Sequence, residues 1–119
     1  MYPTQEFKEL NQNCQELVVE AENDPIKQLF IGQCLIEGKN DFPTNIELGM
    51  KYLEQSIASG NLESVIYLSQ KLIKGDVITR DLKRAKKYLK KYFNQNNQTI
   101  VNLYGKVLYK EENYSSAFK

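Results

Sequence analysis

The sequence IGQCLIEG at residues 31–38 recurs about 36 residues further on as LSQKLIKG at residues 68–75. A looser third copy, YGKVLY, occupies residues 104–109, and KYL at residues 51–53 is repeated at residues 87–89. A period of this length that carries two helical patterns is typical of helical-hairpin repeats. The spacing therefore predicts an all-α fold in which successive hairpins pack against one another.

Each copy contains two predicted helices of different character. The first, at Pro25–Glu37 and again at Leu62–Lys74, is apolar on nearly every side, so it needs neighbours on several faces. Asp24 is the predicted N-cap of the earlier copy, with proline at the first helical position, where its missing N–H costs nothing. Gly38 and Gly75 end the two helices at positions that favour a left-handed residue.

The second helix of each copy is amphipathic and is predicted to form an outer layer. It should begin at Thr44, in a capping box that ends at Glu47, and at Thr79 in the next copy. A further amphipathic helix is predicted over residues 7–22. Residues 99–110 are predicted to form a third copy of the first helix. The chain is thus divided into a helix or degenerate half-repeat (1–23), two repeats (24–60 and 61–96) and a partial repeat (97–119). Residues 113–119 are predicted to begin another copy of the second helix, which is cut short. This truncation favours the interpretation that the chain is a fragment of a longer array.

Several short motifs keep the same order in both copies. They are Ile31-Gly32, Leu35, Gly38, Tyr52-Leu53, Ala58 and Gly60, then Leu68-Ser69, Leu72, Gly75-Asp76-Val77, Asp81, Arg84-Ala85 and Tyr88-Leu89. This order resembles the Sel1-like repeat family, a relative of the tetratricopeptide repeat, over about residues 24–119. The chain departs from the family pattern at Ser69, which replaces a glycine, at Gly49, which replaces an alanine, and at Phe93-Asn94, which replaces an alanine pair.

The resemblance implies a right-handed α-α superhelix, a solenoid of antiparallel helix pairs that acts as a non-enzymatic scaffold or adaptor. The first helices would line a concave groove for a peptide or protein partner, with an apolar row beside a polar row. The alternative is that the tight superhelix itself buries the apolar row. The candidate groove residues are Gln33, Ile36, Glu37, Ile66, Gln70, Ile73, Lys74, Asn102, Lys106, Tyr109 and Lys110.

A second candidate site is the Lys-rich helix within residues 80–93. Its basic residues fall opposite Leu82, Ala85 and Leu89 on a helical projection. A solvated outer face explains this arrangement, and electrostatic docking onto an acidic partner, an anionic membrane or a nucleic acid is the alternative function. The candidate basic patch consists of Lys83, Arg84, Lys87, Lys90 and Lys91.

Charge is distributed unevenly along the chain although the net charge is only +1. Residues 1–60 hold ten acidic and four basic residues, a net charge of −6. Residues 61–119 hold five acidic and twelve basic residues, a net charge of +7. Such an asymmetry orients partners without determining the fold.

Catalysis has little support in the sequence, and we expect neither an enzyme nor a cofactor, metal ion or small-molecule substrate. The chain has no histidine to activate a serine or cysteine nucleophile, and it has no glycine-rich phosphate loop. Cys14 and Cys34 are expected to be buried thiols of a reduced cytoplasmic protein without a membrane span. The patterns at Asn97-Gln98-Thr99 and Asn113-Tyr114-Ser115 leave open a role in the secretory lumen.

Overall fold

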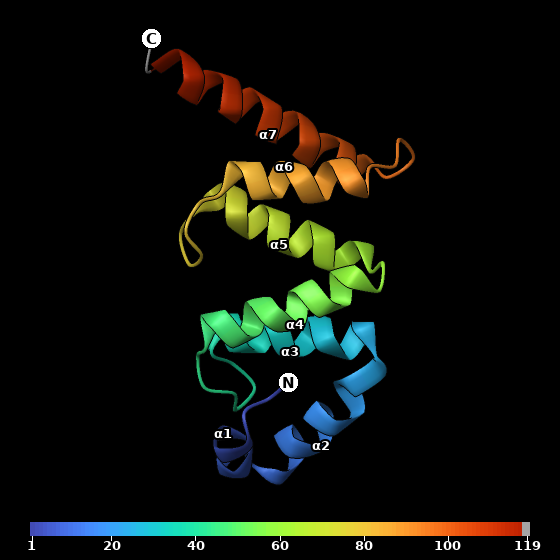
Figure 1. Cartoon of the computed structure of the whole chain (residues 1–119), viewed down its shortest axis with the longest axis vertical. Helices are drawn as coiled ribbons and strands as arrows, with labels where there is room; N and C mark the ends of the chain where they lie inside the picture. The colour runs from blue at the N-terminus through green and yellow to red at the C-terminus, as the bar shows by residue number, and fades with distance from the viewer. Residues whose placement is uncertain (118–119) are drawn as a thin grey trace. The chain divides into compact units, whose positions relative to one another are not determined.

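Helices form all of the regular structure in residues 1–117, the part of the chain that the computed structural model describes (Figure 1). The all-α class predicted from the sequence is therefore confirmed. Contacts divide the chain into an N-terminal unit, Met1–Ser64, and a C-terminal unit that starts at Val65, within α5. The elements are α1 (Thr4–Glu9), α2 (Gln12–Glu20), the 3₁₀ helix η1 (Ala21–Asn23), α3 (Pro25–Glu37), α4 (Ile46–Ala58), α5 (Leu62–Lys74), α6 (Leu82–Lys91) and α7 (Gln98–Ala117).

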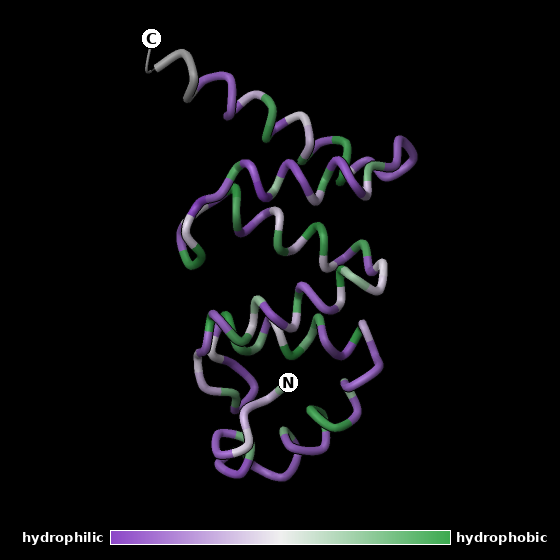
Figure 2. Tube along the Cα trace, in the orientation of Figure 1, coloured by the Kyte–Doolittle hydropathy of each residue, from purple (hydrophilic) through white to green (hydrophobic). Residues whose placement is uncertain are grey.

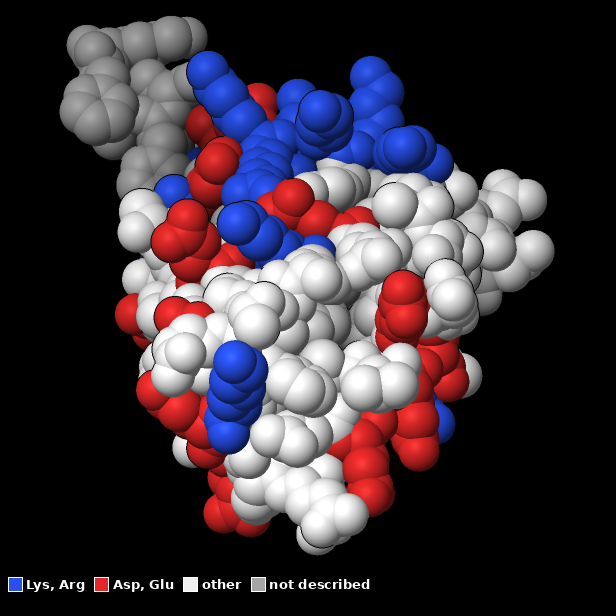
Figure 3. All heavy atoms as spheres, turned by 60° about the horizontal axis from the view of Figure 1, so that its bottom comes forward, with Lys and Arg blue, Asp and Glu red and all other residues white. Residues whose placement is uncertain are grey.

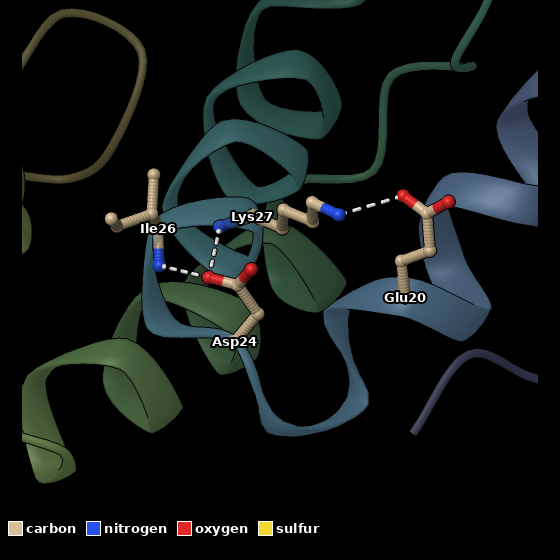
Figure 4. A network of polar contacts seen from close by, with 4 residues as sticks. All are labelled: Glu20, Asp24, Ile26 and Lys27. Atoms are coloured by element: carbon tan, nitrogen blue, oxygen red, sulfur yellow. Dashed lines mark hydrogen bonds and ion pairs between the residues drawn. The ribbon is translucent and has the colours of Figure 1, made fainter.

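The start and the end of α3 are those that the sequence predicts. The Asp24 carboxylate accepts hydrogen bonds from the backbone N–H groups of Ile26 and Lys27, at 3.0 and 3.3 Å (Figure 4). The Lys27 side chain also reaches Glu20 of α2, with 2.8 Å between Nζ and Oε2 (Figure 4). At the other end, Gly38 adopts a φ of 64°, in the left-handed region that glycine tolerates best.

Two facing glycines let α3 and α4 approach each other closely within the N-terminal unit. A Cβ atom on Gly32 would lie 3.1 Å from the carbonyl oxygen of Gly49, and a Cβ atom on Gly49 would lie 3.0 Å from that of Gly32. Leu53 and Ile36 flank this crossing and are buried. The contact therefore depends on the absence of side chains at two positions.

The N-cap of α4 is Asn45, so the prediction of a cap at Thr44 is wrong by one residue. The Asn45 side chain accepts a hydrogen bond from the backbone N–H of Leu48 at 3.1 Å. Its own backbone N–H donates to the carbonyl oxygen of Leu35 at 2.8 Å. Asn45 thus both opens α4 and attaches the loop to the last turn of α3.

Buried serines connect α3, α4 and the first turn of α5. The Ser56 hydroxyl donates to the Pro25 carbonyl oxygen at 2.7 Å, and it shares a hydrogen bond of 2.6 Å with the Ser64 hydroxyl. Both serines are fully buried. Asn61 caps α5 by accepting a hydrogen bond from the backbone N–H of Ser64 at 2.9 Å. The hydroxyls of Ser56 and Ser64 thus find hydrogen-bond partners although both side chains are fully buried.

The single helix predicted over residues 7–22 is instead divided into α1 and α2. The chain leaves the helical conformation at Leu10, whose ψ is 152°, and restarts at Asn11. The Asn11 side chain caps α2 by accepting from the backbone N–H of Cys14 at 2.8 Å. The break occurs because asparagine is a favoured N-cap residue, and because a break at this point allows Leu10 to be buried.

In the C-terminal unit, the connection from α5 to α6 is held by polar contacts at both ends. Gly75 ends α5 with a φ of 72°. The Arg80 guanidinium donates to the carbonyl oxygens of Ile73 and Lys74, at 3.1 and 3.3 Å. The N-cap of α6 is Asp81, which accepts from the Arg84 N–H at 3.0 Å, so the predicted start at Thr79 is wrong by two residues.

The helix α6 is mostly hydrophilic, with short hydrophobic stretches between the charged residues (Figure 2). Only Ala85 and Leu89 are fully buried among its 10 residues. Asp81 also donates its backbone N–H to the carbonyl oxygen of Leu72 in α5, at 3.0 Å. The helix therefore buries a narrow apolar stripe, Lys86 pairs with Glu111 of α7 at 3.2 Å, and Lys83, Lys87, Lys90 and Lys91 are exposed.

The helix α7 is longer than predicted. It runs without interruption for 20 residues, so the separate second-type helix expected to open at Asn113 is not formed within the described residues. The reason is local, because residues 111–117 contain neither glycine nor proline to end a helix. Asn97 caps α7 by accepting from the Ile100 N–H at 3.2 Å. Phe118 and Lys119, which the same prediction included, lie outside the described residues.

Candidate functional site

A groove with a volume of about 600 Å³ lies in the C-terminal unit and is lined by α5, α7 and the loop that follows α5. Five of its eight lining residues are cationic and none is a carboxylate. No lining residue is aromatic. The lining residues are Gln70, Lys71, Ile73, Lys74, Arg80, Leu103, Lys106 and Lys110.

Helical spacing explains why these side chains meet. Residues three and four positions apart lie on the same face of a helix, which brings Gln70 and Lys74 of α5 together around Ile73. On α7, Lys106 and Lys110 are four positions apart on one face. Ile73 and the Leu103 side chain of α7 are 2 % and 8 % exposed, so they form an apolar floor beneath the charged rim.

Two of the five cations already have partners within the unit. Arg80 covers carbonyl oxygens at the end of α5, as described above, which satisfies acceptors that a helix end leaves open. Lys74 pairs with Asp76, with 3.1 Å between Nζ and Oδ2. The hydrogen bond from the Val77 backbone N–H, and then the bond from Lys74, lower the pKa of the Asp76 carboxyl below its ordinary value. Asp76 therefore stays ionised and offsets the charge of Lys74.

The other three cations of the groove are Lys71, Lys106 and Lys110. None of them forms an ion pair with a residue in the range 1–113, whose side chains the structure describes. Lys71 places its Nζ atom 5.5 Å from the centre of the Tyr67 ring. The charge of this rim is thus available to a partner. On the face drawn in Figure 3, most of the Lys and Arg side chains lie close together, with Asp and Glu side chains among them.

Five of the predicted groove residues therefore line one groove: Gln70, Ile73, Lys74, Lys106 and Lys110. Ile66, Asn102 and Tyr109 do not line it, although Tyr109 is 67 % exposed. Lys71, Arg80 and Leu103 also line the groove, although the repeat pattern did not predict them there. Lys71 directly follows a predicted groove position and Arg80 begins the Lys-rich stretch, so both signals were present in the sequence.

Two members of the predicted apolar row, Ile36 and Ile73, are buried, whereas the third, Tyr109, is exposed. Ile36 and Ile73 are each only 2 % exposed, because Ile36 packs against Gly49 in the N-terminal unit and Ile73 lies in the floor described above. Of the remaining positions predicted in the first copy, Gln33 is half-buried and Glu37 pairs with Lys39 at 2.9 Å. These two isoleucines are therefore buried within their own units and do not offer an apolar surface to a partner.

The candidate basic patch lies on the solvent face of α6. Lys83, Lys87, Lys90 and Lys91 are exposed, and within residues 1–113 the first three form no ion pair. Arg84 is half-buried, and its guanidinium carbon lies 5.8 Å from the centre of the Tyr88 ring.

The N-terminal unit offers a second cavity, of about 420 Å³, but its groups are poor catalysts. Burial raises the pKa of the Tyr52 hydroxyl, which lines it, to about 12, so this group stays neutral. Cys14 is not among the residues that line this cavity; burial and then the nearby Asp41 raise the pKa of its thiol, which makes it a weak nucleophile. Cys14 and Cys34 are both buried free thiols.

Comparisons with protein-family models, with curated proteins and with solved structures found no match for this chain. Within the described residues, no helix has both the length and the apolar content that a membrane span requires. No group of three or more Cys, Asp or Glu side chains in that part of the chain is placed to hold a metal ion.

Proposed function

We propose that this chain is a non-enzymatic interaction module that binds a peptide or protein segment in the groove of its C-terminal unit. The observation that carries the proposal is that eight residues from two helices and a loop line one groove of about 600 Å³. Three of its lysines have no ion pair within the described side chains, so they are free to meet a partner.

The proposed architecture is a Sel1-like solenoid, a right-handed superhelix of antiparallel pairs. Recurring caps support it: Asp24, Asn61 and Asn97 each accept a hydrogen bond at the start of α3, α5 and α7. These three residues are 37 and 36 positions apart in the sequence. Stacking in this order would use the first helix of each pair as the inner surface.

A loop contact recurs at the same period. The backbone N–H of Asn45 donates to Leu35 at 2.8 Å, and that of Asp81 donates to Leu72 at 3.0 Å. In both places the residue that caps the second helix is attached to the last turn of the first. The recurrence supports the same hairpin connection in the two copies.

A peptide selection on the immobilised chain tests the proposed function. Random peptides displayed on phage are selected against the wild type, and the enriched sequences are synthesised and measured by fluorescence anisotropy. We expect enriched peptides whose binding is lost when Lys106 and Lys110 are changed to glutamate. Enrichment of no peptide, or equal binding by this variant, would contradict the proposal.

A second candidate function is electrostatic docking of the α6 face onto a polyanion such as a nucleic acid or an anionic membrane. It is favoured by three exposed lysines, Lys83, Lys87 and Lys90, that form no ion pair within residues 1–113. Charge reversal at these positions should abolish binding to labelled single-stranded DNA or to phosphatidylserine vesicles. Unchanged binding of both probes would exclude this function.

A further inference from the structure

The groove of the C-terminal unit combines a small apolar floor with an unneutralised basic rim. Ile73 and Leu103 make the floor. Since Lys74 and Arg80 are engaged within the unit, the charge offered to a partner comes from Lys71, Lys106 and Lys110. The three lysines stand on two helices, so they surround the floor from more than one side.

From this chemistry we infer that the occupant of the groove is an acidic peptide segment with an apolar residue between its carboxylates. The inference rests on the proposed function and names the chemistry of its partner. The carboxylates pair with Lys71, Lys106 and Lys110, while the apolar side chain covers Ile73 and Leu103. A basic segment is excluded by repulsion from the same lysines.

An extended segment has the right spacing for this arrangement. Its alternate side chains point the same way and lie roughly 6.5 Å apart. An apolar residue with acidic residues two positions before and after it therefore presents one anchor and two carboxylates to the groove. No covalent step is involved.

The lining favours a peptide over a nucleic acid. Single-stranded nucleic acids bind by stacking bases on aromatic side chains above a basic track. None of the eight lining residues is aromatic, and the floor is aliphatic. An aliphatic floor between lysines suits a leucine between glutamates.

Two labelled peptides test the inference. Each has about nine residues, with one leucine flanked by alternate glutamates in the first and by glutamines in the second. In about 0.1 M salt we expect the glutamate peptide to bind at least about tenfold more tightly. The difference should shrink in about 1 M salt, where charges more than about 3 Å apart are screened.

A matched pair of variants locates the binding. Lys106→Glu with Lys110→Glu should weaken binding of the glutamate peptide by about tenfold or more. Lys83→Glu with Lys87→Glu makes the same change in net charge on exposed residues of α6, and it should alter binding by less than about twofold. Circular dichroism of both variants checks that their helices are intact.

The outcomes separate the inference from the function on which it rests. Equal affinity for the glutamate and glutamine peptides overturns the acidic partner while leaving a peptide groove in place. An equal loss in both variants overturns it as well, because the net field and not the groove would then attract the peptide. If single-stranded DNA binds and only the Lys106 and Lys110 variant loses it, the occupant is a nucleic acid. Failure of every peptide, including the selected ones, overturns the proposed function too.

Discussion

The α3–α4 pair of the N-terminal unit and the α5–α6 pair of the C-terminal unit share a connection but differ where their helices pack. In the first pair, Gly32 and Gly49 bring two backbones into contact. The corresponding residues of the second pair are Ser69 and Ala85, both fully buried. The same connection therefore tolerates glycines in one copy and larger residues in the other.

The two units also differ in surface charge. Residues 1–64 hold eleven acidic and four basic residues, whereas residues 65–119 hold four acidic and twelve basic ones. The groove lies in the basic unit, and the close crossing of α3 and α4 at Gly32 and Gly49 lies in the acidic one. The residues of the close helix packing and those of the proposed binding groove are therefore different, so each set can be changed without the other.

The largest effect is expected from Gly49→Ala. The new methyl group would meet Ile36 Cγ1 at 2.8 Å and the Gly32 carbonyl oxygen at 3.0 Å, and the second of these is backbone that cannot move alone. Overpacking should exceed the gain in helix propensity, so we expect a loss of about 1–2 kcal/mol in the free energy of unfolding. Urea unfolding followed by circular dichroism measures it.

The control is Gly105→Ala in α7, where an added Cβ atom meets no atom within 4 Å. Without a clash only the propensity gain remains, so this variant should be more stable by about 0.5–1 kcal/mol. If both substitutions shift stability in the same direction, the close crossing of α3 and α4 is wrong.

A smaller effect on stability is expected when either of two buried serines is changed to alanine. The Ser56 hydroxyl bonds to Pro25 and Ser64, so Ser56→Ala should cost about 1–2 kcal/mol. The Ser69 hydroxyl is buried without a hydrogen-bond partner, so Ser69→Ala should be neutral or stabilising by up to about 1 kcal/mol. Thermal unfolding of the two variants compares them, and an equal loss would contradict the assigned bonding.

Much of the fold followed from the sequence because its strongest signals are local. The bounds of α3 and α5 were predicted correctly, since Asp24, Gly38 and Gly75 mark their ends by backbone chemistry alone. The caps at Asn45 and Asp81 were missed because a threonine nearby is also a good cap, and the attachment to the preceding helix decides between them.

The candidate site was predictable only in part. Helical spacing placed Gln70, Lys74 and Lys106 on the faces that line the groove. It could not show that Ile36 is buried, because that depends on how closely α4 approaches, which two glycines control. The length of α7 was missed because a weak repeat signal was preferred to the plain absence of a helix-ending residue.

A further effect concerns alkaline pH and the N-terminal unit. Burial, and then the neighbouring Tyr2, raise the pKa of Tyr52 from its ordinary value near 10 to about 12. The stability that this shift contributes is complete below about pH 10 and is lost as pH rises through 12, because the unfolded chain releases its proton first. Tyr52→Phe should therefore lose less thermal stability between pH 9 and 11.5 than the wild type. Parallel curves for the two proteins would show that Tyr52 is accessible to water.

The proposed binding of a peptide in the groove is tested most directly by an NMR titration of the ¹⁵N-labelled chain with the tightest peptide from the selection. The account predicts that amide shifts concentrate at the groove positions of α5 and α7, with Gln70, Lys74 and Lys106 among the largest. Amides of the α3–α4 crossing should stay unchanged. Shifts confined to α6 or to the N-terminal unit would contradict the account, because the partner would then bind away from the groove.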